Sequence, residues 1–280
     1  MIIIADSGGS KIDWRLIKKD GKISQAYSPG FNPYYQPVED LHKSIKENIV
    51  SMADETVTKV FFYGAGVSSE KNQEVIRDAF AVYFKDAVTF VGWDLLAAGR
   101  ALCGNEPGIA CIMGTGSNSC LYDGKDIVHV VANLGWILAD EGSGSNIGRK
   151  FLFEYLRGKQ PASVAEKFKE QYPLTREEFL EKVYQGDRPS AFLASFTRFI
   201  HQNLNEEYCY KLIYRCFTEF YEEVVMRYDG YQNYKVHFTG SIAYHFSDVL
   251  RKAGADKGIT VRHIMEGPIA GLTLYHQGDV

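Results

Sequence analysis

The first hundred residues alternate short apolar runs with turn signals and amphipathic patterns, which is typical of an α/β protein. Apolar runs predict strands over 2–5, 12–17 and 23–27, with a turn at Asp6-Ser7-Gly8-Gly9-Ser10-Lys11 between the first two. Helical spacing predicts helices over 38–52 and 70–84, and buried runs predict strands over 59–63 and 87–91. Because strands alternate here with crossover helices, part of the sheet is expected to be parallel.

The opening pattern returns after Gly108. Strands are predicted over 109–113, 119–122 and 127–131, and the first two are joined by the small-residue turn Gly114-Thr115-Gly116-Ser117. Both copies close their hairpin with an Asp-Gly-Lys turn, at Asp20-Gly21-Lys22 and at Asp123-Gly124-Lys125. The identity between the copies is low, so the repeat is one of pattern. It predicts two related α/β domains, over 1–104 and 105–266, each with a glycine-rich hairpin tip.

Residues 143–228 form a helical block within the second domain. Helices are predicted over 146–156, 163–171, 176–184, 190–203 and 206–228. After the block we expect strands over 235–239 and 260–262, a helix running from Gly240-Ser241 toward Lys252, and a final helix over 267–276. Aromatic stripes at helical spacing usually face a core, which is the expected place of Phe217, Phe220, Tyr221 and Tyr228. The sequence leaves open whether the chain forms a homodimer through this block.

The composition places the chain among ordinary globular proteins, with 280 residues, 45% hydrophobic residues and a net charge of −4. Because it has no basic surplus, we expect a small-molecule partner and no nucleic acid. Five cysteines without a Cys-x-x-Cys pair predict neither a disulfide framework nor a zinc ribbon. The first residues lack the features of a signal peptide and no apolar run reaches ~18 residues, so we expect a cytoplasmic protein without a membrane segment.

The two tips, Ser7–Lys11 and Gly114–Asn118, are candidate phosphate sites. Glycine-rich tips expose backbone N–H groups without a Cβ in the way, which suits a phosphate. A single tip of this kind is more often only a hairpin turn, but two of them at equivalent places strengthen the hypothesis. Lys11 and the hydroxyls of Ser10, Thr115 and Ser117 would add donors. A P-loop motif and a Rossmann glycine motif are both missing from the sequence.

Several other positions carry two interpretations each. Asp6 ends a buried strand, where it is either a magnesium-associated carboxylate or the cap of a tight turn. Asp94 follows a predicted strand, where it is a helix N-cap, a catalytic acid or base, or both. Gly64-Ala65-Gly66 either packs closely or contacts a ligand. Asp140-Glu141-Gly142-Ser143-Gly144 is either a helix cap or a ligand-facing loop.

Taken in order, these motifs resemble the BadF/BadG/BcrA/BcrD-type ATPase family of the actin-like (sugar kinase/Hsp70/actin) superfamily, in its N-acetylglucosamine kinase branch. The resemblance spans nearly the whole chain. It rests on the first tip, Gly64-Ala65-Gly66, Asp94-Leu95-Leu96-Ala97-Ala98, the second tip, Asp140–Gly144 with Ile147-Gly148-Arg149, Thr239-Gly240-Ser241 and Pro268-Ile269-Ala270-Gly271.

The resemblance implies two ribonuclease-H-like domains with ATP and Mg²⁺ in a nucleotide cleft between them, and a final helix, 267–280, that packs back on the first domain. It implies ATP-dependent phosphorylation of an amino sugar, with N-acetylglucosamine as the expected substrate. The implied roles are a catalytic base (Asp94), a metal site (Asp6), phosphate contacts (Gly8, Gly9, Ser10, Lys11, Gly114, Thr115, Gly116 and Ser117), adenosine contacts (Gly240 and Ser241) and sugar contacts (Asn32, Gly135 and Asp140).

One departure concerns the recognition of the sugar. The family has Gly-Trp-Gly shortly before its Asp-Glu-Gly-Ser box, whereas this chain reads Leu134-Gly135-Trp136. Counted back from Asp140 without gaps, Leu134 takes the tryptophan position and Trp136 is displaced. The departure puts the acyl group that is recognised in doubt and leaves the phosphoryl-transfer residues untouched.

Two alternative functions stay open. One is an ATPase that activates a dehydratase or reductase through an iron–sulfur cluster, which would require cysteine thiolates at a subunit interface. The cysteines here, at 103, 111, 120, 209 and 216, lie within apolar or helical patterns, which favours buried packing. The other is a non-catalytic sugar or nucleotide sensor, although such a protein would have no use for a proton acceptor at Asp94.

Overall fold

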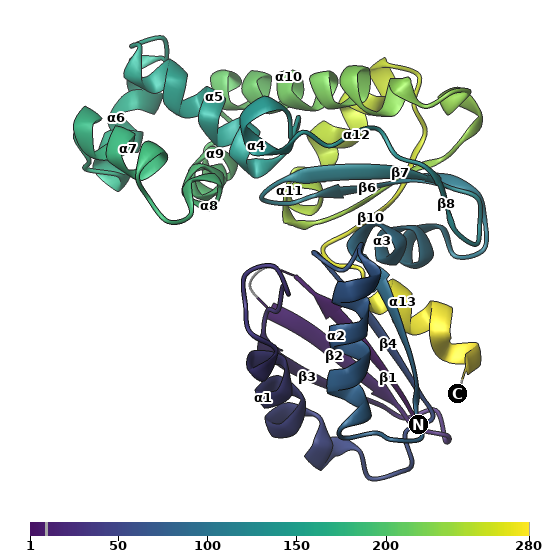
Figure 1. The fold of residues 1–280 in the computed structure, drawn as a ribbon. Coiled ribbons are helices and arrows are strands. Elements are labelled where there is room, and N and C mark those ends of the chain that lie inside the picture. Colours follow the sequence, from purple (N-terminus) through teal and green to yellow (C-terminus); the bar gives the residue numbers. More distant parts are fainter. Residues whose placement is uncertain (9–10, 280) are drawn as a thin grey trace. The chain divides into compact units, whose positions relative to one another are not determined.

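The computed structural model describes residues 1–8 and 11–279, which divide into two compact units. The first unit comprises 1–106, 124–126 and 267–280, and the second comprises 107–123 and 127–266. Each unit is built on one mixed sheet of five strands with helices around it. Figure 1 traces the order of the elements along the chain.

The sheet of the first unit has the strand order β3-β2-β1-β4-β5. The first three strands form an antiparallel meander, and β4 and β5 continue the sheet in parallel with β1. The strands are β1 Ile2–Ser7, β2 Lys11–Ile17, β3 Ile23–Pro29, β4 Lys59–Gly64 and β5 Val88–Trp93, and the helices are α1 Val38–Asn48, η1 Val50–Met52, α2 Glu70–Ala81, α3 Asp94–Cys103, α13 Ile269–His276 and η4 Gln277–Asp279.

Strand β1 is buried on both faces, since Ile2, Ile3 and Ile4 are all fully inaccessible. Successive side chains of a strand point to opposite faces. Ile3 packs with α1 and α2, which lie together on one face of the sheet (Figure 1). Helices α3 and α13 also contact β1, and we assign them to the face of Ile2 and Ile4.

The sheet of the second unit repeats this topology. Its order, β8-β7-β6-β9-β10, again joins an antiparallel meander to two parallel strands. The predicted repeat is therefore confirmed. The strands are β6 Gly108–Met113, β7 Ser117–Tyr122, β8 Ile127–His129, β9 Val236–Thr239 and β10 Val261–Met265.

A block of helices lies in the chain between β8 and β9, as predicted (Figure 1). The four aromatic residues expected in a core do pack inward, since Phe217, Phe220, Tyr221 and Tyr228 are at most 1% exposed. The helices of this unit are α4 Gly135–Leu138, α5 Gly144–Leu156, α6 Ala162–Gln171, α7 Arg176–Tyr184, α8 Pro189–Ser195, α9 Thr197–Gln202, α10 Glu207–Glu223, η2 Val225–Arg227, η3 Tyr231–Asn233, α11 Ser241–His245 and α12 Ser247–Asp256.

Several predicted helices were longer than the observed ones, and one short helix was not predicted. The helix over 190–203 divides at Phe196, and the helix that starts at 241 divides at Phe246. Both phenylalanines are buried, so tertiary packing outweighs the helical periodicity at these points. The helices expected over 38–52 and 206–228 end at Asn48 and Glu223, and each is followed by a short 3₁₀ segment. Helix α4 was not predicted because its four residues are too few to show a period.

A buried polar network attaches the end of the chain to the first sheet. The Tyr63 hydroxyl lies 2.7 Å from His276 Nε2 and accepts a hydrogen bond from Arg100 Nη1 at 2.7 Å. Since the hydroxyl accepts from Arg100, its own proton is available to His276. His276 also lies 2.9 Å from Asp279 and stacks on Phe61. Burial lowers the pKa of His276 and favours the neutral ring that accepts from Tyr63.

In the part of the chain that the structure describes, no helix is long and apolar enough to cross a membrane.

The Tyr63 network predicts a stability effect. Tyr63→Phe removes the hydroxyl, so that Arg100 Nη1 and His276 Nε2 each lose this buried hydrogen bond, and we expect it to lower the free energy of unfolding by about 1–3 kcal/mol. Tyr184→Phe is the matched control, because Tyr184 is 80% exposed and its replacement should change stability by less than about 0.5 kcal/mol. Urea denaturation followed by circular dichroism measures both, and equal midpoints for the two variants would contradict the role of the network.

Candidate functional site

The predicted site residues fall into two sets, one at the end of the parallel strands in each unit. In the first unit, β1, β4 and β5 run in parallel, with Asp6 opposite Tyr63 and Gly64 opposite Trp93. The carboxyl ends of these strands therefore meet at one edge of the sheet. Asp6, the loop after β4 and Asp94 lie along this edge.

Asp6 lies among like charges. Its partner in the neighbouring strand is Asp13, and Asp94 is near enough to act on it. Burial, Asp13 and Asp94 together raise the pKa of Asp6 to about 7, whereas Lys11 lowers it. Sequence reasoning missed Asp13, although counting residues back from the hairpin tip would have placed it opposite Asp6.

Lys11 is paired within the protein. Its ammonium lies 2.8 Å from Asp13 and 5.2 Å from the ring of Tyr27. The N–H of Gly8 donates to the carbonyl of Lys11 at 2.9 Å and closes the tip. Gly9 and Ser10, which were predicted to contact phosphate, lie outside the described residues.

Asp94 is the first residue of α3, and Trp93 holds the N-cap position. The cap interpretation of Asp94 is thus wrong by one residue. Its Oδ1 accepts from the N–H of Leu95 at 2.9 Å, which fixes the carboxylate at the start of the helix. Burial raises the pKa of Asp94, and this hydrogen bond works in the opposite direction. A fixed carboxylate with a raised pKa is suited to accept a proton.

Asn32 lies in a loop that is fastened to the end of β1. The Ser7 hydroxyl donates to the carbonyl of Phe31 at 2.8 Å and accepts from its N–H at 3.2 Å. The Asn32 carboxamide oxygen accepts from the N–H of Tyr34 at 3.0 Å. Sequence reasoning missed this role of Ser7.

In the second unit, the second tip is joined to the start of α5. The N–H groups of Gly144 and Ser145 donate to the carbonyls of Gly114 and Thr115 at 2.8 and 3.0 Å. Ser143 is the N-cap of α5. The start of this helix is therefore occupied by the tip itself, and the loop before it serves as a cap and as a support for the tip.

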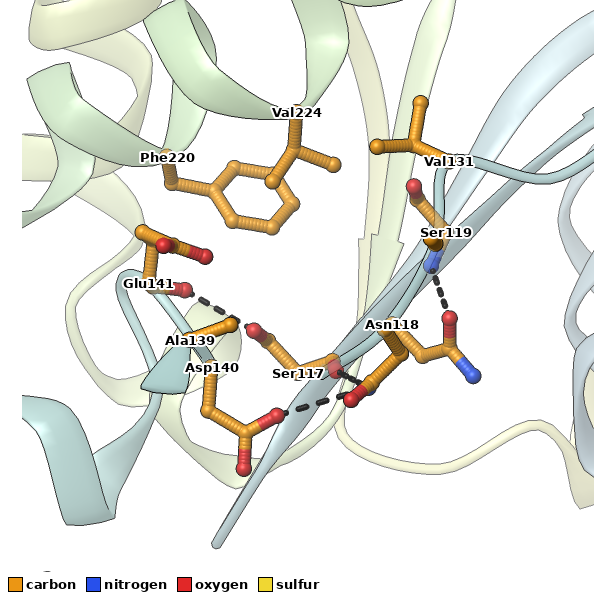
Figure 2. A pocket seen from close by; sticks show the side chains of 11 residues that line it. Ser117, Asn118, Ser119, Val131, Ala139, Asp140, Glu141, Phe220 and Val224 are labelled. Atoms are coloured by element: carbon orange, nitrogen blue, oxygen red, sulfur yellow. Dashed lines mark hydrogen bonds between the residues drawn. The ribbon is translucent and has the colours of Figure 1, made fainter. Parts of the chain in front are cut away.

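Asp140 and Ser117 line a small pocket in the second unit. Its volume is about 20 Å³, which is room for about one water molecule. Figure 2 shows the carboxylate of Asp140 on one side of this space and Phe220 with Val224 on the other. The Ser117 hydroxyl donates to the carbonyl of Glu141 at 2.9 Å.

Asp140 has an unusual backbone. Its φ is +57°, the one positive value outside glycine among residues 1–8 and 11–279. A non-glycine residue in this region costs energy and often marks a functional site. Burial raises the pKa of Asp140, while hydrogen bonds from Ser117 and Asn133 lower it. Gly116 makes room for the carboxylate, because a Cβ there would lie 2.8 Å from Asp140 Oδ2.

The structure also shows how segment 134–138, where the sequence departs from the family pattern, packs. Trp136 packs partly buried against the second core, whereas Leu134 is 59% exposed. Gly135 adopts a φ of +74° and its N–H donates to Asn133 Oδ1 at 2.6 Å. Asn133, which sequence reasoning missed, also donates to the Ser117 carbonyl. The Asn-x-Gly turn signal could have identified it.

Gly240 lies close to the end of β6. It has a φ of +119°, and a Cβ would lie 2.3 Å from the Met113 carbonyl oxygen. Its N–H donates to the Met265 carbonyl at 3.0 Å, and Ser241 begins α11. Gly240, Ser241 and the second tip therefore lie at the carboxyl end of the parallel strands of this unit.

The described residues hold no group of three or more His, Cys, Asp or Glu side chains arranged to bind a metal. A magnesium ion carried by a nucleotide needs only one or two protein carboxylates, because phosphates and water supply its other ligands. Asp6 fits this requirement, since its carboxylate lies near enough to those of Asp13 and Asp94 for their charges to act on it.

The repeated pair of units, each with functional candidates at the carboxyl edge of its parallel strands, defines an actin-like two-domain fold, as predicted. A putative N-acetylglucosamine kinase from Porphyromonas gingivalis is 36% identical, with a TM-score of 0.92 over 100% of this chain and 99% of that one. The chain belongs to the same family as that protein.

Two further structures share the fold. A putative N-acetylglucosamine kinase from Chromobacterium violaceum is 14% identical, with a TM-score of 0.72 over 98% of each chain. A ROK family glucokinase from Streptomyces griseus, in complex with glucose and AMPPNP, is 16% identical, with a TM-score of 0.59 over 99% of this chain and 98% of that one. No protein-family model and no curated protein sequence matches the chain.

The charge cluster around Asp6 predicts how stability depends on pH. The Asp6 carboxyl has a pKa of about 7 in the folded chain and of about 3.9 in the unfolded chain. Between these two pH values, the folded chain therefore binds more protons than the unfolded chain. The free energy of unfolding therefore falls as pH rises through this window. Without nucleotide, we expect a loss on the order of 2 kcal/mol between pH 5 and pH 8.

The variant Asp6→Asn carries no titrating group at this position, so its free energy of unfolding should not show this decrease between pH 5 and pH 8. At pH 8 we therefore expect the variant to be more stable than the unmodified protein. Urea midpoints of both proteins at pH 5, 6.5 and 8 measure the difference. If the two proteins follow parallel pH profiles, the assignment of the raised pKa to Asp6 is wrong.

Proposed function

We propose that this protein is an ATP-dependent sugar kinase that transfers the γ-phosphate of ATP to a hydroxyl of an amino sugar, with N-acetylglucosamine as the first substrate to test. The observation that carries the proposal is the position of Asp94 at the carboxyl end of β5, on the same sheet edge as Asp6 and in the unit that contains Asn32. The name of the P. gingivalis relative supports the choice of substrate, and the AMPPNP in the S. griseus glucokinase supports ATP.

In the proposed reaction, a sugar hydroxyl attacks the γ-phosphorus atom of ATP while Asp94 accepts the hydroxyl proton. The bond from phosphorus to the ADP oxygen breaks, which yields ADP and a sugar phosphate. Phosphoryl transfer depends mainly on positioning, charge neutralisation and one proton acceptor. The raised pKa of Asp94 suits it to take up this proton.

The other predicted residues take supporting roles in this proposal. Asp6 would hold Mg²⁺, with Asp13 beside it, and the ion when bound supplies positive charge next to the phosphates. The phosphates would contact Gly8, Lys11 and the second tip, the adenosine would contact Gly240 and Ser241, and the sugar would contact Asn32, Gly135 and Asp140. The nucleotide cleft, the assignment to the BadF-type family and a cytoplasmic location stay predictions.

The burial of the cysteines argues against the alternative function of an electron-transferring ATPase. Cys111, Cys120, Cys209 and Cys216 are buried and Cys103 is half-buried. Burial raises the pKa of Cys103 to about 12 and that of Cys209 and Cys216 to about 11. An iron–sulfur cluster needs accessible thiolates, so these residues are poor ligands for one. The non-catalytic sensor is distinguished from a kinase by the following experiment.

The catalytic role of Asp94 predicts a separation of turnover from binding. Asp94→Asn removes the proton acceptor but keeps the size of the side chain and an oxygen that can accept from Leu95. We expect kcat with N-acetylglucosamine to fall by about 10²–10⁴-fold, while the Kd for ATP changes less than about twofold. A coupled assay of ADP release and titration calorimetry measure the two quantities.

Asp187→Asn is the control, because Asp187 is exposed on the surface and its replacement should leave both quantities unchanged. If Asp94→Asn turns over as fast as this control, Asp94 is not the base.

A further inference from the structure

Gly66, in the loop after β4, touches the side chain that we propose to contact the sugar. A Cβ on Gly66 would lie 2.3 Å from Asn32 Oδ1, 2.9 Å from Asn32 Cγ and 3.0 Å from Tyr34 Cδ2. Real side chains essentially never approach so closely, so any larger residue at position 66 must move the Asn32 carboxamide. Sequence analysis left the role of this glycine open between close packing and ligand contact.

The carboxamide of Asn32 is held in one orientation. Its oxygen accepts from the backbone N–H of Tyr34 at 3.0 Å, so this oxygen is turned toward the loop and the NH₂ group takes the other side. The backbone N–H of Asn32 donates to Gln36 Oε1 at 2.9 Å, and Gln36 Nε2 donates to the Gly30 carbonyl at 3.0 Å. The loop is thus built around a fixed carboxamide.

Gly66 is itself fixed from the other side. Its carbonyl accepts from Asn72 Nδ2 at 2.6 Å, which attaches the loop after β4 to the first turn of α2. The Ser7 hydroxyl holds the neighbouring residue Phe31. The Asn32 loop therefore lies between two supports, the end of β1 and the loop that contains Gly66.

We infer that Gly66 is a positioning residue for sugar binding, which leaves room for the Asn32 carboxamide in the orientation in which its NH₂ group donates to an oxygen of the sugar. The inference rests on the proposed function and specifies it further. At this position the site would recognise a hydrogen-bond acceptor, which is a hydroxyl or carbonyl oxygen of the substrate.

The competing explanation is that Gly66 is needed only for its backbone, since its φ is +79°. Gly21 provides a matched control for this explanation. It lies in the same unit with a φ of +83°, but a Cβ there would meet nothing within 4 Å. Alanine at either position carries a similar backbone strain, and only alanine at position 66 meets Asn32.

The experiment compares Gly66→Ala with Gly21→Ala. We expect Gly66→Ala to raise KM for N-acetylglucosamine by about tenfold or more, with KM for ATP within about twofold of that of Gly21→Ala. Urea midpoints should fall in both variants, and further in Gly66→Ala, because its Cβ also displaces the Asn32 carboxamide. Equal sugar KM values in the two variants would overturn the inference, because the backbone strain would then account for the glycine.

Two further variants test whether Gly66 affects sugar binding through Asn32. In an Asn32→Ala background, Gly66→Ala should have no additional effect on sugar KM, since the group it displaces is gone. Asn32→Asp keeps the oxygen that accepts from Tyr34 but loses the NH₂ donor, and it should also raise sugar KM about tenfold or more. Additive effects in the double variant, or an unchanged KM for Asn32→Asp, would overturn the inference.

The unmodified protein separates this inference from the proposed function. If it neither binds N-acetylglucosamine by calorimetry nor releases ADP in the presence of the sugar, the proposed function fails and the inference falls with it. If it phosphorylates the sugar while Gly66→Ala behaves like Gly21→Ala, the proposed function stands and the inference alone is wrong.

Discussion

The parallel pairing of β1 with β4 and of β4 with β5 determines where chemistry can occur in the first unit. Parallel strands end at the same edge of a sheet, so residues distant in sequence, such as Asp6 and Asp94, come near enough for their charges to interact. The second unit repeats the arrangement with β6, β9 and β10 and brings its glycine tip next to Gly240. Each unit thus supports one set of candidate site residues.

At these sheet edges, candidate site residues pack closely against glycines. Gly66 makes room for Asn32 and Gly116 makes room for Asp140, while Gly240 lies against the backbone of β6. In the first two cases the neighbouring group is a polar side chain that we propose to bind the sugar. Gly66 and Gly116 therefore leave room for candidate site residues, besides permitting turns.

Sequence patterns predicted the repeat, the two hairpins and the strand that precedes Asp94, because these depend on local periodicity and turn chemistry. They failed where tertiary packing decides, as at Phe196 and Phe246, which are buried and divide predicted helices. The packing of Trp136 against the second core was also beyond them, because it depends on a contact that no sequence period records. Lys11 pairs with Asp13 two residues along β2, on the same face of the strand, and this pairing was missed because Lys11 was assigned to the hairpin tip.

The central claim is that the protein transfers phosphate to a sugar. The most direct measurement is phosphorus NMR of the unmodified protein incubated with ATP, Mg²⁺ and N-acetylglucosamine. The account predicts one sugar phosphate for each ADP formed, and no sugar phosphate when the sugar is left out. Formation of ADP and free phosphate without any sugar phosphate would contradict it, and would favour an ATPase instead.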